Sequence, residues 1–168
     1  MKAQVLMLKQ DDPFKCTSAK LVKFGLAQSV KYIPRYALTL NPFSENLLSK
    51  QDTKISNFVC AIDCSWEHDD VILKHRSILM RGLGRRLPLL LAANPINYSK
   101  LGKLSTVEAL AGSLYILGYQ QMANELMNKF KWGHTFLELN CNILEDYANA
   151  ETKTRITEIE KEYFPQLS

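Results

Sequence analysis

The chain has 168 residues, of which 46% are hydrophobic and 23% are charged. These values exclude a disordered tail, a collagen-like chain and a disulfide-stapled miniprotein. No apolar run reaches the ~18 residues that a membrane-spanning helix needs, and no cleavable signal pattern follows the N-terminus. We therefore expect a cytoplasmic protein with one domain of ordinary size, or with two small parts that share an interface.

Charge is divided unevenly along the chain, whose net charge is +4. Residues 1–103 carry 16 Lys and Arg against 8 Asp and Glu, whereas residues 104–168 carry 5 against 9. The basic half suggests a polyanionic partner, although a solvated basic surface without a partner explains the count equally well.

In chain order, the first half alternates apolar runs with short helical stretches. Apolar runs that end in polar or Pro-containing turns predict strands at four places, 5–8, 36–40, 58–62 and 87–93. Thr17 or Ser18 is expected to cap a helix over residues 20–28. The run at 58–62 has no polar alternation, and helices separate the strands. We therefore expect a parallel sheet that is covered on both faces.

The second half has helical periodicity and almost no strand signal. Ser105 and Glu108 form a capping-box pattern, which predicts a helix that ends at Gly118. Three further helices are predicted over residues 120–129, 136–148 and 153–164. The expected architecture is an α/β part over residues 1–92 and a mainly helical part over residues 93–168 packed against it.

The cysteines give weak support for a metal site. Without a signal peptide, reduced thiols are expected at all four, which are Cys16, Cys60, Cys64 and Cys141. A zinc site at Cys60 and Cys64 would need two more ligands, and neither His68 nor His75 belongs to a paired-ligand motif. Ordinary thiols are the better interpretation, so no metal is predicted.

Asp63 follows the apolar run at 58–62 and would therefore lie at the carboxyl end of a buried strand. Ligands of open parallel sheets bind beyond these strand ends, so Asp63 is either an N-cap or a working carboxylate. Trp66 is either a core side chain or a ring wall that holds a cation. The loop at 94–103 is either a plain surface loop or a source of backbone groups for a nucleobase.

These segments together resemble the ribosome-biogenesis aminocarboxypropyltransferases, which modify a nucleotide of small-subunit rRNA. The resemblance covers roughly residues 12–148. Its most specific motifs are Asp63-Cys64-Ser65-Trp66, Arg86-Leu87-Pro88 and the runs at 92–98 and 104–109. It implies a SPOUT-like α/β fold, with a knotted parallel sheet in the N-terminal half and an all-helical C-terminal half. The trefoil knot would be tied between residues 62 and 106.

The resemblance also implies a reaction. S-adenosylmethionine would donate its 3-amino-3-carboxypropyl group to N3 of a uridine or an N1-methylpseudouridine, and methylthioadenosine would leave. Asp63 would take the N3 proton as general base or hold a ligand in place, and Trp66 would cover the methyl side of the sulfonium. The implied cofactor-binding residues, most of which would act through backbone atoms, are Thr17, Ile62, Trp66, Leu87, Gly102 and Thr106.

The implied RNA surface belongs to the basic half, and the target base would have to be unstacked. Its candidate phosphate contacts are Lys15, Lys20, Lys23, Arg81, Arg85, Arg86 and Lys103. We expect a monomer, because the helical half could replace the dimer contact of knotted methyltransferases. Two alternatives stay open, an RNA methyltransferase on the same scaffold and an RNA-binding assembly factor that needs no cofactor.

Overall fold

The computed structural model describes residues 1–8, 16–64 and 77–167. In this part of the chain the strands form one sheet in the order β2-β1-β4-β3-β5, and every pairing is parallel. The strands are β1 (Lys2–Met7), β2 (Gln28–Ser29), β3 (Leu38–Leu40), β4 (Phe58–Asp63) and β5 (Leu83–Arg85). The expected parallel α/β sheet is therefore confirmed.

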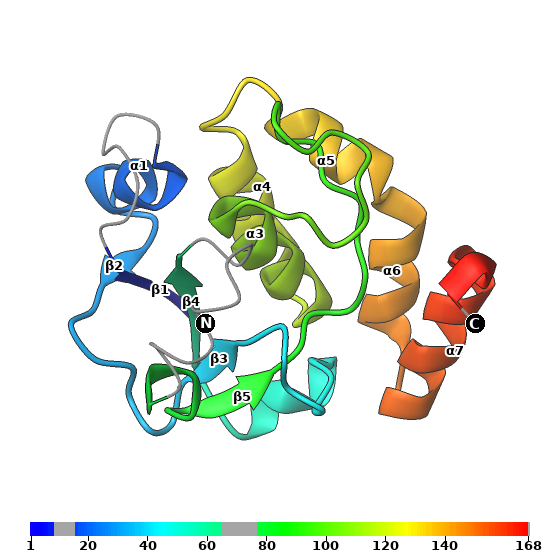
Figure 1. Ribbon diagram of the computed structural model, residues 1–168, viewed down its shortest axis with the longest axis horizontal. Helices are drawn as coiled ribbons and strands as arrows, with labels where there is room; N and C mark the ends of the chain where they lie inside the picture. Colours follow the sequence, from blue (N-terminus) through cyan, green and yellow to red (C-terminus); the bar gives the residue numbers. More distant parts are fainter. Residues whose placement is uncertain (9–15, 65–76, 168) are drawn as a thin grey trace.

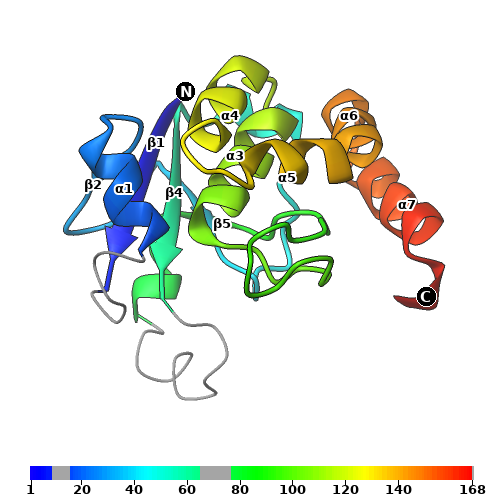
Figure 2. The same ribbon diagram turned by 90° about the horizontal axis from the view of Figure 1, so that it is seen from above.

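Helix α1 (Thr17–Lys23) lies between β1 and β2 in the sequence, and the 3-10 turn η1 (Lys50–Lys54) lies between β3 and β4. The last strand is followed by α3 (Thr106–Ile116), α4 (Gln120–Met127), α5 (Gly133–Leu139), α6 (Cys141–Asn149), α7 (Lys153–Tyr163) and the 3-10 turn η2 (Pro165–Leu167). Helix α3 packs against β4 and α1. Helices α3 and α4 lie between the strands and α5–α7, which extend away from the sheet (Figures 1 and 2). No helix in the described residues is both long and apolar enough to cross a membrane.

Strand β4 lies at the centre of the sheet and is buried on both faces. Val59 and Ala61 belong to the main core, which also includes the buried side of α3. Cys60 and Ile62 point to the opposite face and join a smaller apolar cluster with Ile33. This explains why the run at 58–62 shows no polar alternation, because neither face of the strand meets water.

The prediction of a strand over residues 87–93 is wrong. The segment is extended, but only Leu91 makes an isolated bridge, to Leu101. Asn140 satisfies the backbone of Leu91, since Leu91 N donates to Asn140 Oδ1 at 2.8 Å and Asn140 Nδ2 donates to Leu91 O at 2.9 Å. Leu90 and Ala92 pair instead with the backbone of residues 99–102, which belong to the following loop and not to the sheet. Strand β5 forms just before it at Leu83–Arg85, which includes Gly84 and has no apolar run that would have predicted it.

Helix boundaries differ from expectation at three places. The helix expected over residues 20–28 is α1, which ends at Lys23, and Gln28 already belongs to β2. Thr17 is the first residue of α1, and Cys16 is its N-cap, so the expected cap at Thr17 or Ser18 is wrong. The helix expected over 136–148 is two helices, separated at Asn140, whose side chain also donates to Phe136 O. The capping box that begins α3 is confirmed.

Candidate functional site

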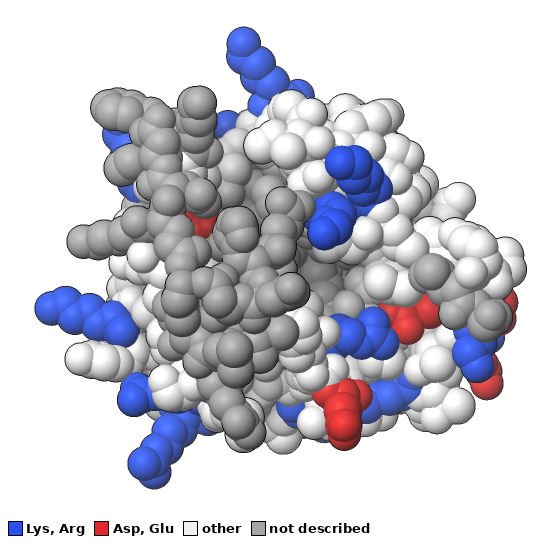
Figure 3. Space-filling view, viewed as in Figure 1, with Lys and Arg blue, Asp and Glu red and all other residues white. Residues whose placement is uncertain are grey.

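A cleft of about 1010 Å³ opens at the carboxyl ends of β3 and β4. The N-terminal ends of α1 and α3 and the extended segments at 86–90 and 101–104 complete its walls. Ligand sites of open parallel sheets lie beyond these strand ends. In the face shown in Figure 3, basic side chains are spread over the left and upper parts, and most of the visible acidic atoms lie at the lower right.

The cleft brings together most of the residues that the resemblance assigns to the cofactor. Thr17, Ile62, Leu87, Gly102 and Thr106 all line it, and so does Asp63. These residues come from two helix starts, a strand end and two connecting segments. Trp66 lies outside the described residues.

At the carboxyl end of β4, the Asp63 carboxylate links this strand to the starts of α1 and α3. Cys16 Sγ donates to its Oδ2 at 3.0 Å, and Thr106 Oγ1 donates to its Oδ1 at 2.9 Å. A carboxylate offers about four acceptor positions, so each oxygen keeps room for another donor. Asp63 is therefore fixed in orientation and still able to accept a hydrogen bond from a ligand.

Cys16 acts here as a hydrogen-bond donor. Partial burial, and to a smaller extent its hydrogen bond to Asp63, raise the pKa of the Cys16 thiol above its usual value. The backbone amide of Ala19, which donates to Cys16 Sγ at 3.4 Å, acts in the opposite direction. The thiol therefore keeps its proton at neutral pH, as its bond to Asp63 requires.

Glu108 is completely buried and holds both ends of the segment at 93–105, which carries Gly102. Its carboxylate accepts five hydrogen bonds of 2.6–2.9 Å, from Ala93 N, Asn94 N, Asn94 Nδ2, Ser105 N and Ser105 Oγ. Its pattern in the sequence indicated only a capping box. The bonds to residues 93 and 94 are tertiary, so local spacing gave no signal for them.

The C-terminal helices hold the neighbouring segment, which carries Leu87. Arg86 donates from two guanidinium nitrogens to Glu160, at 3.1 and 3.3 Å, and Leu89 N donates to the same carboxylate at 2.9 Å. The buried Tyr147 hydroxyl donates to Leu89 O at 3.1 Å. Helices α6 and α7 therefore shape a cleft wall to which they contribute no lining residue.

The candidate RNA contacts fall into two groups. Lys20 and Lys103 are exposed and line the cleft, and Lys23 and Arg81 are exposed beyond it. Two arginines are instead held by acids within the protein, namely Arg86 by Glu160 and Arg85 by Asp52 at 2.9 Å. Lys15 lies outside the described residues.

The lining also includes aromatic side chains to which no sequence motif pointed. Phe130 and Trp132, between α4 and α5, reach the same cleft. The described residues contain no group of three or more His, Cys, Asp and Glu side chains placed to hold a metal ion.

Comparison with known proteins agrees with this geometry. Residues 38–164 match the family model "Ribosome biogenesis protein, C-terminal". The 16S rRNA aminocarboxypropyltransferase of Methanopyrus kandleri is 41% identical over 96% of this chain and 97% of its own length. The enzyme of the same name from Thermoplasma acidophilum is 44% identical, over 95% of this chain and 96% of its own.

A solved structure is also similar, that of the SAM-dependent rRNA:acp-transferase Tsr3 from Vulcanisaeta distributa. It matches with a TM-score of 0.84 and 37% identity, over 98% of this chain and 89% of that one. Matches of this extent cover the strands, the cleft and the C-terminal helices together. The chain therefore belongs to the ribosome biogenesis protein family, and its relatives include the 16S rRNA aminocarboxypropyltransferases of M. kandleri and T. acidophilum.

Proposed function

We propose that this protein is an enzyme that transfers the 3-amino-3-carboxypropyl group of S-adenosylmethionine to N3 of a uridine-type base in small-subunit rRNA. Its relatives carry the name 16S rRNA aminocarboxypropyltransferase, and the similar solved structure is described as SAM-dependent. The observation that carries the proposal is the cleft in which Asp63 and five of the six implied cofactor residues meet.

The lining of the cleft fits S-adenosylmethionine. Leu87, Leu104 and Ala109 offer apolar surface for an adenine ring, and Asp63 is the acidic side chain among the described lining residues. A carboxylate with unused acceptor positions suits a ligand that carries an ammonium and a sulfonium. When bound, S-adenosylmethionine supplies an electrophilic carbon that N3 attacks as the bond from that carbon to sulfur breaks, which releases methylthioadenosine.

Two roles are open to Asp63. As a general base it would take the N3 proton, and as a positioning group it would hold the donor or the base. Single-turnover transfer by Asp63→Asn separates the two roles when donor binding is measured on the same variant. A large loss of rate with unchanged donor affinity indicates the base, whereas weakened donor binding indicates positioning.

The finer features of the proposal rest on the resemblance. We propose phosphate contacts at Lys15, Lys20, Lys23, Arg81 and Lys103, whereas Arg85 and Arg86 mainly hold the site together. Trp66 is proposed to cover the donor's methyl group. A monomer, a cytoplasmic location and a division near residue 92 stay predictions.

A knotted path is part of the same proposal. Hydrogen bonds hold the exit from β5 on two sides: Asn41 N donates to Arg85 O at 2.9 Å, and Arg86 N donates to Asn46 O at 2.8 Å. Leu48 N also donates to Arg86 O, at 2.9 Å. The loop at 41–48 therefore contacts the chain at Arg85 and Arg86, within the range in which the knot is proposed.

The nucleoside by-product tests the proposed reaction. Incubation with S-adenosylmethionine and unmodified small-subunit rRNA is expected to release methylthioadenosine, which chromatography separates from S-adenosylhomocysteine. S-adenosylhomocysteine would support the methyltransferase alternative. No donor binding in a calorimetric titration would support the assembly factor.

A further inference from the structure

The connection between α4 and α5 brings two aromatic rings to the cleft. The Phe130 and Trp132 ring centroids lie 5.5 Å apart, and the ring planes are tilted by 40°. Both side chains are half-buried, since they pack against the main core and also line the cleft. The resemblance assigns neither residue to the donor.

Lysines alternate with these two rings, since residues 129–132 read Lys-Phe-Lys-Trp. Both lysines are exposed. Lys129 Nζ lies 5.5 Å from the ring centroid of Phe24, which follows the basic last turn of α1. Two of the five basic residues in the acidic half of the chain thus flank the two lining rings in the sequence.

We propose that residues 129–132 form a subsite for an unpaired base of the RNA substrate. The base stacks on Phe130 and Trp132, and Lys129 and Lys131 contact the phosphates beside it. Aromatic faces combined with cationic side chains are the arrangement by which proteins bind single-stranded nucleic acid. The proposal rests on the proposed function and deepens it, because it places the acceptor strand at a defined end of the cleft.

The cleft is large for a small-molecule site. Pockets for one drug-sized ligand typically measure about 300–1000 Å³, and this cleft reaches the top of that range at about 1010 Å³. The implied donor residues Ile62, Leu87 and Thr106 belong to a strand end, a connecting segment and the start of α3. The aromatic pair comes from a separate element, the connection between α4 and α5.

The test removes each ring while keeping an apolar side chain, with Phe130→Leu and Trp132→Leu. Fluorescence anisotropy with a labelled single-stranded rRNA fragment, in the absence of donor, is expected to show a Kd raised roughly 5- to 150-fold. The Kd for S-adenosylmethionine, measured by calorimetry, is expected to stay unchanged. Tyr163→Leu, at the end of α7, is the matched control, because it removes an exposed aromatic ring outside the cleft.

RNA affinities equal to that of Tyr163→Leu, with thermal unfolding intact, would overturn the subsite. A change in donor affinity alone would also overturn it, because the rings would then hold the donor's adenine. Since the RNA is bound without donor, the subsite can be confirmed even if the wild-type protein transfers no group. Normal transfer and RNA affinity in both Leu variants would remove the subsite and leave the proposed function in place.

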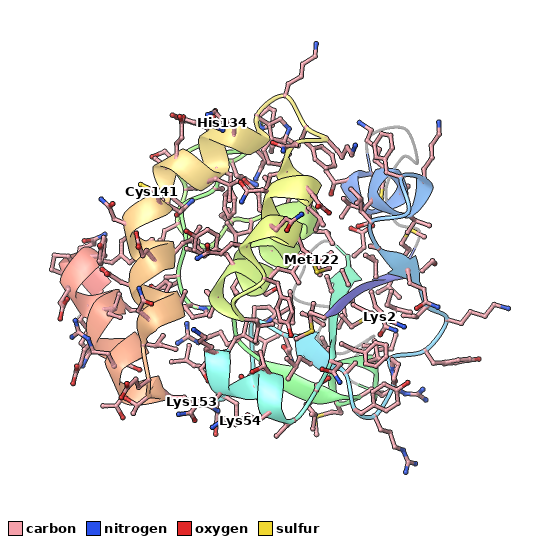
Figure 4. All side chains as sticks on the ribbon, turned by 180° about the vertical axis from the view of Figure 1, so that it is seen from behind. Lys2, Lys54, Met122, His134, Cys141 and Lys153 are labelled. Atoms are coloured by element: carbon pink, nitrogen blue, oxygen red, sulfur yellow. The ribbon has the colours of Figure 1, made fainter. Side chains whose placement is uncertain are left out.

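A charge variant covers the case in which loss of a ring unfolds the protein. Lys131→Gln is expected to lower the slope of log Kd against log salt concentration by about one. Lys54→Gln is the control. His134 lies near the start of α5, three residues after Lys131, and Figure 4 shows Lys54 at the opposite end of the molecule from His134. An unchanged slope for Lys131→Gln would contradict the proposal.

Discussion

Thr106 Oγ1 donates a hydrogen bond of 2.9 Å to Asp63 Oδ1, which joins the first residue of α3 to the last residue of β4. The two residues are separated by 43 positions in the sequence. Cys16 occupies the other carboxylate oxygen from the N-cap of α1. The orientation of Asp63 therefore depends on two helix starts, which are the places where the cleft residues Thr17 and Thr106 also lie.

Thr106→Val removes this hydrogen bond with little change in shape. Because the acceptor is a carboxylate, we expect a loss of about 1.5 kcal/mol in the free energy of unfolding. We also expect donor binding to weaken several-fold, since Asp63 loses one of its two fixed partners. Urea denaturation and calorimetry measure the two effects, and Thr106→Ser should restore both. Wild-type values for Thr106→Val would show that the bond does not position Asp63.

Glu108→Gln is expected to be strongly destabilising. Each oxygen of the buried carboxylate accepts at least two hydrogen bonds, from Ala93 N and Asn94 N on one side and from Asn94 Nδ2 and Ser105 N on the other. A Gln side chain replaces one of these oxygens by an NH₂ group, so the donors on that side lose their acceptor in either orientation of the amide. We expect a loss of about 3 kcal/mol in the free energy of unfolding, measured by urea denaturation. The control is Glu145→Gln, at an exposed position of α6, which should change stability by less than about 0.5 kcal/mol. Equal effects of the two variants would contradict the role assigned to Glu108.

Arg86 is expected to act mainly within the protein. In a double-mutant cycle with Arg86→Met and Glu160→Gln, we expect a coupling free energy of about 1–3 kcal/mol, because the partners share two hydrogen bonds. For RNA binding, Lys20→Gln should lower the salt slope by about one, whereas Arg86→Met should not. A lower slope for Arg86→Met would make Arg86 a phosphate contact.

We expect the buried Cys60 thiol to make the folded protein less stable at alkaline pH. Burial raises the pKa of the Cys60 thiol from 9.0 to about 12. The unfolded chain therefore releases this proton first as the pH rises, and folding loses free energy between pH 9 and about 12. Cys60→Ala costs stability at pH 7 by leaving a small cavity, but it lacks this dependence. Urea denaturation at pH 7, 9 and 10.5 should show the stability difference between wild type and Cys60→Ala shrinking, and a constant difference would contradict the assignment.

The sequence predicted correctly those elements whose structure depends on residues close together in the chain. The continuous apolar run at 58–62 predicted β4, because that strand is buried on both faces. Ser105 and Glu108 predicted the start of α3, because a capping box is a contact within one helical turn. Gly118, expected as the stop, has a φ of 89° just after the helix ends. Glycine adopts this left-handed conformation without a side-chain penalty.

Tertiary contacts decided the elements that the sequence missed. Asn140 separates α5 from α6 while its amide pairs with the backbone of Leu91, and that same pairing takes the place of the expected strand at 87–93. Asp63 was predicted as a site residue from its position at the end of a buried strand, whereas Thr17, Leu87 and Gly102 were predicted from the resemblance. The Cys16 partner of Asp63 is 47 residues away, so no local spacing could indicate it.

In the proposed reaction, one specific carbon of S-adenosylmethionine is transferred to the RNA. The most direct measurement incubates the protein with unmodified small-subunit rRNA and donor labelled either in the aminocarboxypropyl group or in the methyl group. We predict aminocarboxypropyl label in the RNA and no methyl label. Methyl label in the RNA would contradict the proposed reaction. No label from either donor, on naked rRNA and on pre-ribosomal small subunits alike, would contradict a role as a transferase.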